Sequence, residues 1–149
     1  MSEYLRKTRL FKDLTDEQLR KISSRGEERR IPEDEHVFRE GEVGHELFVV
    51  MDGRIQISVE MSLPTEQAPV HTVTSGSVFG EFALVSDHER SASALALRET
   101  MVFALSREAF RDLAEEDPRL DYLVLHELGQ ILVGRLIKTT KELRASLMF

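Results

Sequence analysis

One stretch of the chain carries most of its chemical information: Gly76-Ser-Val-Phe-Gly-Glu-Phe-Ala-Leu-Val-Ser-Asp-His-Glu-Arg-Ser-Ala-Ser-Ala94. Gly80 lets the backbone take a positive φ, and the run from Glu81 to Val85 suits a single helical turn. The start of a helical turn presents free N–H groups and a positive dipole end, which attract anions. Arg90 follows nine residues after Glu81, and its planar guanidinium can donate two parallel hydrogen bonds to a phosphate. The stretch therefore indicates a phosphate site.

On both sides of this stretch, from about residue 30 to 105, short apolar runs alternate with turn residues. The run from Leu47 to Met51 predicts a buried strand, and the alternation from Ile55 to Met61 predicts a half-buried one. The Asp52-Gly53 pair between them is a hairpin signal. A polar loop is expected over Ser62–Pro69, and further strands over Val70–Val73, Ser91–Leu97 and Met101–Leu105. Many short strands at this spacing predict an all-β barrel or jelly roll.

Helical patterns flank the β region. Thr15 and Gln18 have the spacing of a capping box for an N-terminal helix. Ser106 can cap a short helix, and Asp117-Pro118 marks the start of a long one that extends to about residue 145. This last helix carries leucines near a 3.5-residue spacing: Leu125, Leu128, Leu132, Leu136 and Leu143. The stripe fits packing on another helix as well as docking on the chain's own barrel.

Length and charge restrict the class of protein. A chain of 149 residues is one ordinary domain, here 1–149, with a helical part over 1–29, a barrel over 30–105 and C-terminal helices over 106–149. The net charge of −7 disfavours a broad nucleic-acid or anionic-membrane surface, although a local pocket can still hold one phosphate. The chain has no cysteine, no apolar run of membrane-spanning length and no secretory signal pattern, so we expect a cytoplasmic protein.

Catalytic and metal sites have no support in the sequence. The five histidines are scattered, and none forms an H-x-H or H-E-x-x-H pair. No Ser-His-Asp arrangement can be picked out. We therefore expect neither an enzyme nor a metal protein.

The stretch quoted above resembles the phosphate-binding cassette of cyclic-nucleotide-binding domains, over residues 76–92. Three segments carry the resemblance in register: Phe79-Gly80-Glu81, Ala83-Leu84 and Arg90-Ser91-Ala92. The glycines that agree with the family pattern are Gly41, Gly44, Gly53 and Gly76. Three positions depart from it: His45 stands where aspartate is frequent, Asp34 where a turn glycine is expected, and Glu89 where proline is usual.

The resemblance implies a fold: a double-stranded β-helix (jelly-roll) barrel with an N-terminal helix and a long C-terminal helix that serves as lid and dimer helix. It also implies roles. Arg90 would pair with the cyclic phosphate, the backbone after Gly80 and the Ser91 hydroxyl would complete the cradle, and Glu81 would accept the ribose 2′-hydroxyl. The expected ligand contacts of the cassette are Phe79, Gly80, Glu81, Phe82, Ala83, Arg90, Ser91 and Ala92.

The last helix resembles the dimer helix of the bacterial catabolite activator family over Arg135–Leu143. On that resemblance Thr139 and Thr140 are candidate adenine contacts, one of them across a homodimer formed through this helix. The DNA-reading helix-turn-helix of that family would begin beyond Phe149, so we expect no direct DNA binding by this chain.

The resemblance thus implies a regulatory sensor, not an enzyme. It would bind cyclic AMP, with cyclic GMP as the alternative, move its last helix and act on a downstream protein. Two other interpretations stay open. Arg90 could form a structural salt bridge with Glu81 or Glu89, in which case the chain is a degenerate domain that serves dimerisation or protein interaction. The chain could also be the sensor half of a transcription regulator.

Overall fold

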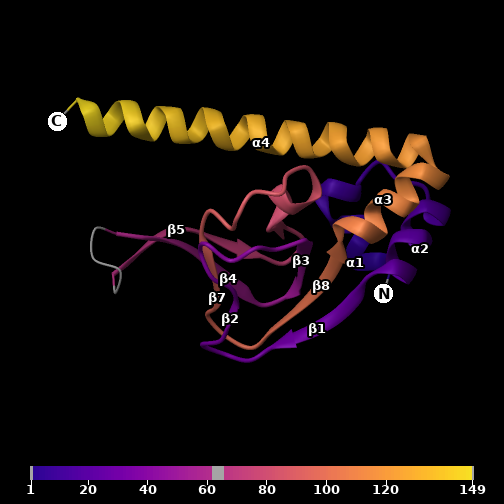
Figure 1. The fold of residues 1–149 in the computed structure, drawn as a ribbon, viewed down its shortest axis with the longest axis horizontal. Coiled ribbons are helices and arrows are strands. Elements are labelled where there is room, and N and C mark those ends of the chain that lie inside the picture. The colour runs from indigo at the N-terminus through magenta and orange to yellow at the C-terminus, as the bar shows by residue number, and fades with distance from the viewer. Residues whose placement is uncertain (1, 62–65, 149) are drawn as a thin grey trace.

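A computed structural model describes residues 2–61 and 66–148 (Figure 1). The chain begins with α1 (Ser2–Lys7), the 3-10 turn η1 (Arg9–Phe11) and α2 (Asp16–Arg25), and it ends with α3 (Arg107–Glu116) and α4 (Pro118–Leu147). Figure 1 shows α4 crossing the whole length of the molecule, with α1, α2 and α3 gathered beneath its N-terminal end. The β region lies below the rest of α4.

The β region consists of two four-stranded antiparallel sheets, with strand orders β1-β8-β3-β6 and β2-β7-β4-β5. The strands are β1 (Glu27–Ile31), β2 (His36–Phe38), β3 (Glu46–Asp52), β4 (Arg54–Glu60), β5 (Gln67–Thr74), β6 (Val78–Phe79), β7 (Ser93–Ala96) and β8 (Thr100–Ser106). Apart from β4 and β5, which pair as a hairpin, consecutive strands lie in different sheets, as in a jelly roll. The expected fold class is confirmed.

The predicted hairpin at Asp52-Gly53 is wrong. β3 pairs with β8 and β6, whereas β4 pairs with β5 and β7, so the turn carries the chain from one sheet to the other. Gly53 has φ 137°, and a Cβ there would overlap the Thr100 side chain. The Thr100 hydroxyl instead accepts the Arg54 N–H at 3.1 Å. The Asp-Gly pair therefore makes a corner of the barrel.

Two strand boundaries also differ from expectation. β5 starts at Gln67, so the polar loop does not reach Pro69, and residues 62–65 of that loop lie outside the described residues. β1 begins inside the segment 1–29 that was expected to be helical. Its sequence, EERRI, has no strand pattern, and the strand is held by backbone pairing with β8 along its full length.

The helix starts agree with their sequence signals. Thr15 and Gln18 form both hydrogen bonds of the capping box. The Ser106 hydroxyl accepts the Ala109 N–H at 3.1 Å, and the Asp117 carboxylate accepts the Leu120 N–H at the same distance. Each cap satisfies an N–H that the helix itself leaves unpaired.

Two apolar cores explain why β3 is apolar without interruption from Leu47 to Met51. Leu47 and Val49 face a core shared with the helices, while Phe48 and Val50 face the core between the sheets. A strand that is buried on both faces has no polar alternation. The core between the sheets contains Phe38, Phe48, Val50, Ile55, Ile57, Val73, Phe79, Ala94, Ala96, Val102 and Ala104.

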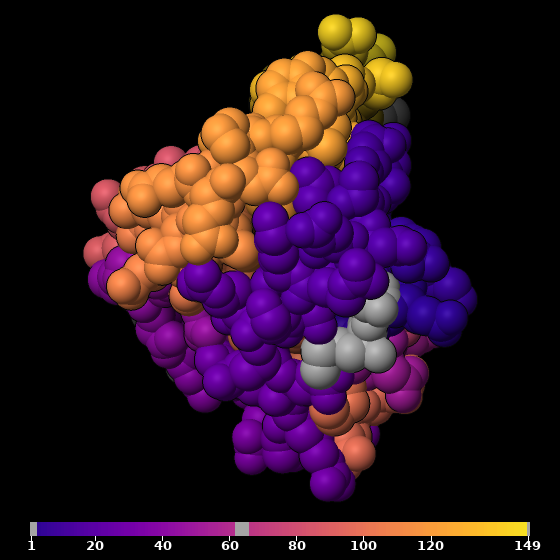
Figure 2. All heavy atoms as spheres, turned by 90° about the vertical axis from the view of Figure 1, so that its right-hand side faces the viewer, coloured from indigo at the N-terminus to yellow at the C-terminus, as the bar shows by residue number. Residues whose placement is uncertain are grey.

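α4 divides into two halves. Leu120, Val124, Leu128 and Ile131 are buried against the helical core, and Figure 2 shows this part lying on the N-terminal segments. Glu127 is also buried and anchors this half of α4 through two ion pairs. Its partners are Arg9 in η1, at 3.0 Å, and Lys12 directly after η1, at 3.6 Å. Leu132 is half-buried against the same core, and after it the apolar side chains are exposed, among them Leu136 and Leu143. The leucine stripe therefore docks on the chain's own core only in its first half. In the described part of the chain, no helix has the length and apolar character needed to span a membrane.

Candidate functional site

A cavity of about 520 Å³ lies between the quoted cassette, strands β4 and β5, and the second half of α4. This volume is typical of small-molecule sites. Of the residues expected at a ligand, the cavity is lined by Phe79, Gly80, Glu81, Phe82, Ala83, Arg90, Ser91, Ala92 and Thr139. Thr140 is exposed and does not line it. The sequence-predicted residues are thus brought together at one site, with that exception.

The turn at Gly80 has the conformation that the sequence required. Gly80 has φ 69°, and the 3-10 turn η2 (Glu81–Leu84) starts directly after it. The first hydrogen bond of this turn runs from Ala83 N–H to the Gly80 carbonyl, at 3.2 Å. The N–H groups of Glu81 and Phe82 precede that bond, so the turn itself does not use them.

Arg90 is buried beside this turn, with 9% of its surface exposed. Its Nη1 donates to the Gly80 carbonyl at 3.2 Å, and its Nη2 donates to the Glu46 carbonyl at 2.9 Å. The guanidinium lies 4.1 Å from the ring centre of Phe38. Its Nε is buried and has no hydrogen-bond partner among the described residues. Burial lowers the pKa of Arg90, so an anion that contacts this group would relieve the cost of its charge.

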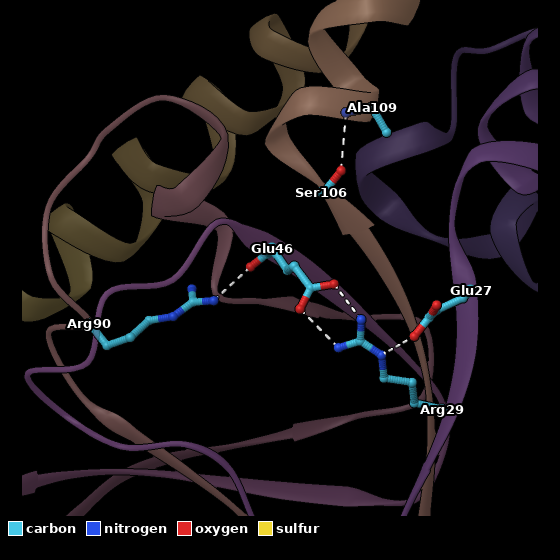
Figure 3. Close-up of polar contacts among 6 residues, drawn as sticks. All are labelled: Glu27, Arg29, Glu46, Arg90, Ser106 and Ala109. Atoms are coloured by element: carbon cyan, nitrogen blue, oxygen red, sulfur yellow. Dashed lines mark hydrogen bonds and ion pairs between the residues drawn. The ribbon is translucent and has the colours of Figure 1, made fainter.

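Residues around Arg90 hold it in this orientation. Figure 3 shows Arg90 reaching the Glu46 carbonyl, while the Glu46 carboxylate binds Arg29 through two hydrogen bonds of 2.8 and 2.6 Å. Arg29 also contacts Glu27. Gly44 leaves room for the guanidinium, because a Cβ at that position would overlap it. These contacts hold Arg90 in one orientation at the cavity.

Glu81 faces α4. Its buried carboxylate forms an ion pair with Arg135, which also donates to the Val78 carbonyl at 3.3 Å. Burial lowers the pKa of Arg135. Among the described residues, Arg90 forms an ion pair with neither Glu81 nor Glu89. The described part of the chain therefore does not contain the structural salt bridge that was the alternative role of Arg90.

Several cavity residues were not identified from the sequence. Arg135, Lys138 and Glu142 lie on the face of α4 that carries Thr139, and His71 projects from β5. Arg135, Lys138 and Glu142 lie three or four residues from Thr139 or from each other, a spacing that places them on one helix face and could have identified them from the sequence. Burial, followed by the positive charges of Arg135 and Lys138, lowers the pKa of His71. The α4 side of the cavity is therefore more polar than the threonine pair alone indicates.

The positions that depart from the cassette pattern have structural explanations. Asp34 adopts φ 69° in place of the expected glycine. His45 Nδ1 accepts a hydrogen bond from Arg107 at 2.8 Å, and Arg107 also pairs with Asp87 at 2.5 Å. Glu89 lies at the cavity wall. His45 thus contacts Arg107, the first residue of α3, and Arg107 in turn connects α3 to the cassette loop through Asp87.

A family model for the cyclic nucleotide-binding domain matches residues 28–117. This chain belongs to the cyclic nucleotide-binding domain family. Among relatives of the domain, the cyclic AMP receptor protein of Thermus thermophilus is 31% identical over 134 residues, which are 90% of this chain and 60% of that protein.

Solved structures agree with this assignment. The domain superposes on the catabolite activator protein of Thermus thermophilus with a TM-score of 0.81 and 31% identity, covering 92% of this chain and 62% of that one. It also resembles the regulatory domain of Toxoplasma gondii PKA, solved with cAMP, with a TM-score of 0.69, 27% identity and coverage of 75% and 42%. The chain therefore spans about three fifths of its Thermus relative, the part that corresponds to the sensor region.

Proposed function

We propose that this domain is a cyclic AMP sensor whose last helix changes position when the nucleotide binds. One observation supports the proposal: the buried guanidinium of Arg90, whose Nε has no hydrogen-bond partner in residues 2–61 and 66–148, lies beside the left-handed Gly80 turn and lines the cavity. Arg90 and the turn would hold the cyclic phosphate. Glu81 would accept the ribose 2′-hydroxyl, and Ser91 and Ala92 would lie beside the phosphate and base.

The expected affinity follows from ligand size. A nucleotide of about 22 heavy atoms, at about 0.3 kcal/mol per atom, gains about 7 kcal/mol, which corresponds to a dissociation constant of low-micromolar order. Relatives of both specificities exist, because cGMP-dependent protein kinases also match this chain, for example that of Caenorhabditis elegans at 25% identity over 89% of it. Cyclic AMP is favoured because the cyclic AMP receptor protein of Thermus thermophilus is more similar, at 31% identity over 90% of this chain. Thr139, on α4, would contact the adenine.

The signal would pass through α4. The Glu81–Arg135 ion pair joins the proposed ribose acceptor to this helix. A ribose hydroxyl that binds Glu81 would therefore alter one of the contacts that hold α4 in place. The nucleotide shifts the equilibrium between two positions of the helix only by the difference between its affinities for the two states. The second half of α4 is the part free to respond, because its apolar residues do not pack on the domain.

These exposed residues also support a homodimer. Val133, Leu136, Ile137, Leu143 and Leu147 follow helical spacing and are each at least half exposed. A second copy that packs along this stripe would bury it. Thr140, which does not line the cavity of its own chain, would then face the partner's nucleotide. Sedimentation of the purified chain at several concentrations tests the dimer, and a monomer at 100 µM with saturating nucleotide would contradict it.

The proposal is tested by calorimetric titration with cyclic AMP, cyclic GMP and 2′-deoxy cyclic AMP. We expect micromolar binding of cyclic AMP and weaker binding of the deoxy analogue, because it lacks the donor for Glu81. In Glu81→Gln the difference between cyclic AMP and its deoxy analogue should shrink. Equal binding of both nucleotides by the parent chain would contradict the role of Glu81, and no heat with any of the three would contradict the proposed function.

A further inference from the structure

A second cavity, of about 250 Å³, lies on the other side of Arg135. It is formed where α4 passes over η1 and the start of β6. Its floor consists of the buried apolar residues Leu10, Val78 and Ile131, and its polar rim is made by Arg9, Ser77, Arg135 and Lys138. Arg135 and Lys138 line both cavities, whereas Arg9 and Ser77 line only this one.

The charges around this cavity are unusual for the chain. The protein carries a net charge of −7, yet every ionisable residue that lines the cavity is a cation. Arg9 uses its Nε to bind Glu127, and Arg135 is paired with Glu81. Lys138 has no acidic side chain within ion-pair distance in residues 2–61 and 66–148. The cavity therefore has more positive than negative charge around it.

The cations of the rim repel each other. The pKa of Arg135 is lowered first by burial and then by the positive charge of Arg9. An anion between these groups would oppose both effects, and the apolar floor would strengthen its attraction by excluding water from one side. Ser77 also lines this cavity, and its hydroxyl is a neutral group that can donate a hydrogen bond to an anion.

We propose that this cavity binds a small phosphate-type oxyanion. Two arginines, a lysine and a hydroxyl are the donors that proteins use for phosphate, and arginine can offer paired N–H groups. The volume is below the roughly 300 Å³ at which pockets for drug-sized ligands begin. The cavity is therefore suited to a free phosphate or a short phosphoester and not to a second nucleotide.

This site would be coupled to the first cavity through Arg135, a consequence that rests on the proposed function. Binding of an anion pulls the guanidinium toward the second cavity and weakens its ion pair with Glu81. Glu81 is then freer to accept a ribose hydroxyl, so phosphate should tighten cyclic AMP binding. By linkage, cyclic AMP tightens phosphate binding by the same factor.

The test is a titration of the full chain with inorganic phosphate at constant ionic strength, without nucleotide, followed in amide NMR spectra. We expect saturable shifts at the amides of Ser77 and Val78. Because the cassette could itself take phosphate, the titration is repeated in Arg90→Ala, where the Ser77 and Val78 shifts should persist. The Arg90→Ala titration thus tests the second cavity even if the first cavity binds no nucleotide.

Arg9→Gln provides the decisive variant. Arg9 does not line the nucleotide cavity, and Glu127 keeps its ion pair with Lys12, so the fold should be retained. Loss of one charge-assisted contact should weaken phosphate binding about tenfold. Lys141→Gln, an exposed cation on the same helix, is the control and should leave it unchanged. Linear, unsaturable shifts, or equal affinity in Arg9→Gln and the parent chain, would overturn the proposal.

Discussion

The substitution Gly44→Ala tests how strictly Arg90 is positioned. The added Cβ would overlap the Arg90 guanidinium, which is held by the Gly80 and Glu46 carbonyls and by Phe38. Forcing extra atoms into a packed site costs about 1–3 kcal/mol. If the Arg90 side chain moves to avoid the new Cβ, its contact with the phosphate is weakened by a similar amount. Affinity for cyclic AMP should then decrease about fivefold to 150-fold. Calorimetric titration measures the change directly.

A matched substitution separates this clash from a general effect of replacing glycine. Gly129 lies within α4, and a Cβ there would meet nothing within 4 Å. Gly129→Ala should raise the free energy of unfolding by about 0.5–1 kcal/mol and leave nucleotide affinity unchanged. In an Arg90→Ala background, Gly44→Ala should have almost no further effect on binding. If Gly44→Ala binds cyclic AMP as tightly as the parent chain, the positioning argument is refuted.

Three further changes have expected outcomes. Thr15→Ala removes the capping box of α2 and should lower the free energy of unfolding by about 1 kcal/mol in urea titrations, without changing nucleotide binding. Glu127→Gln removes the ion pairs that fasten α4 to Arg9 and Lys12; because both partners are exposed, we expect a loss of about 1–2 kcal/mol, and an unchanged urea midpoint would contradict this anchor. The pKa of His71 lies below its ordinary value of 6.5 in the folded chain, so between that folded value and 6.5 the unfolded chain binds more protons and stability falls as the pH is lowered; His71→Gln should flatten this slope in melting curves.

The cassette could be predicted from sequence because its requirements are local. The positive φ of Gly80, the single turn after it and the arginine nine residues beyond Glu81 are all encoded within one short segment. The helix caps at Thr15, Ser106 and Asp117 are local in the same sense. Such features need no knowledge of distant contacts.

Features that depend on distant segments were missed. The Asp52-Gly53 turn has the residues of a hairpin, but Thr100, far along the chain, decides that it is a corner between sheets. β1 has a charged sequence and exists because β8 offers a backbone edge. Arg135 joins the site only because α4 passes over the cassette. Its four-residue spacing from Thr139 places Arg135 on the same face of α4, but this spacing does not indicate that the face packs against the cassette.

The most direct test of the central claim compares cyclic AMP binding by the parent chain and by Arg90→Ala in one calorimetric experiment. Arg111→Ala, which removes an exposed arginine on α3, serves as the control. Arg90 is the buried cation of the cavity, so its loss should cost about 2–5 kcal/mol, a decrease in affinity of about 30-fold to several thousandfold, while the control binds normally. Equal affinity of Arg90→Ala and the parent chain would contradict the account.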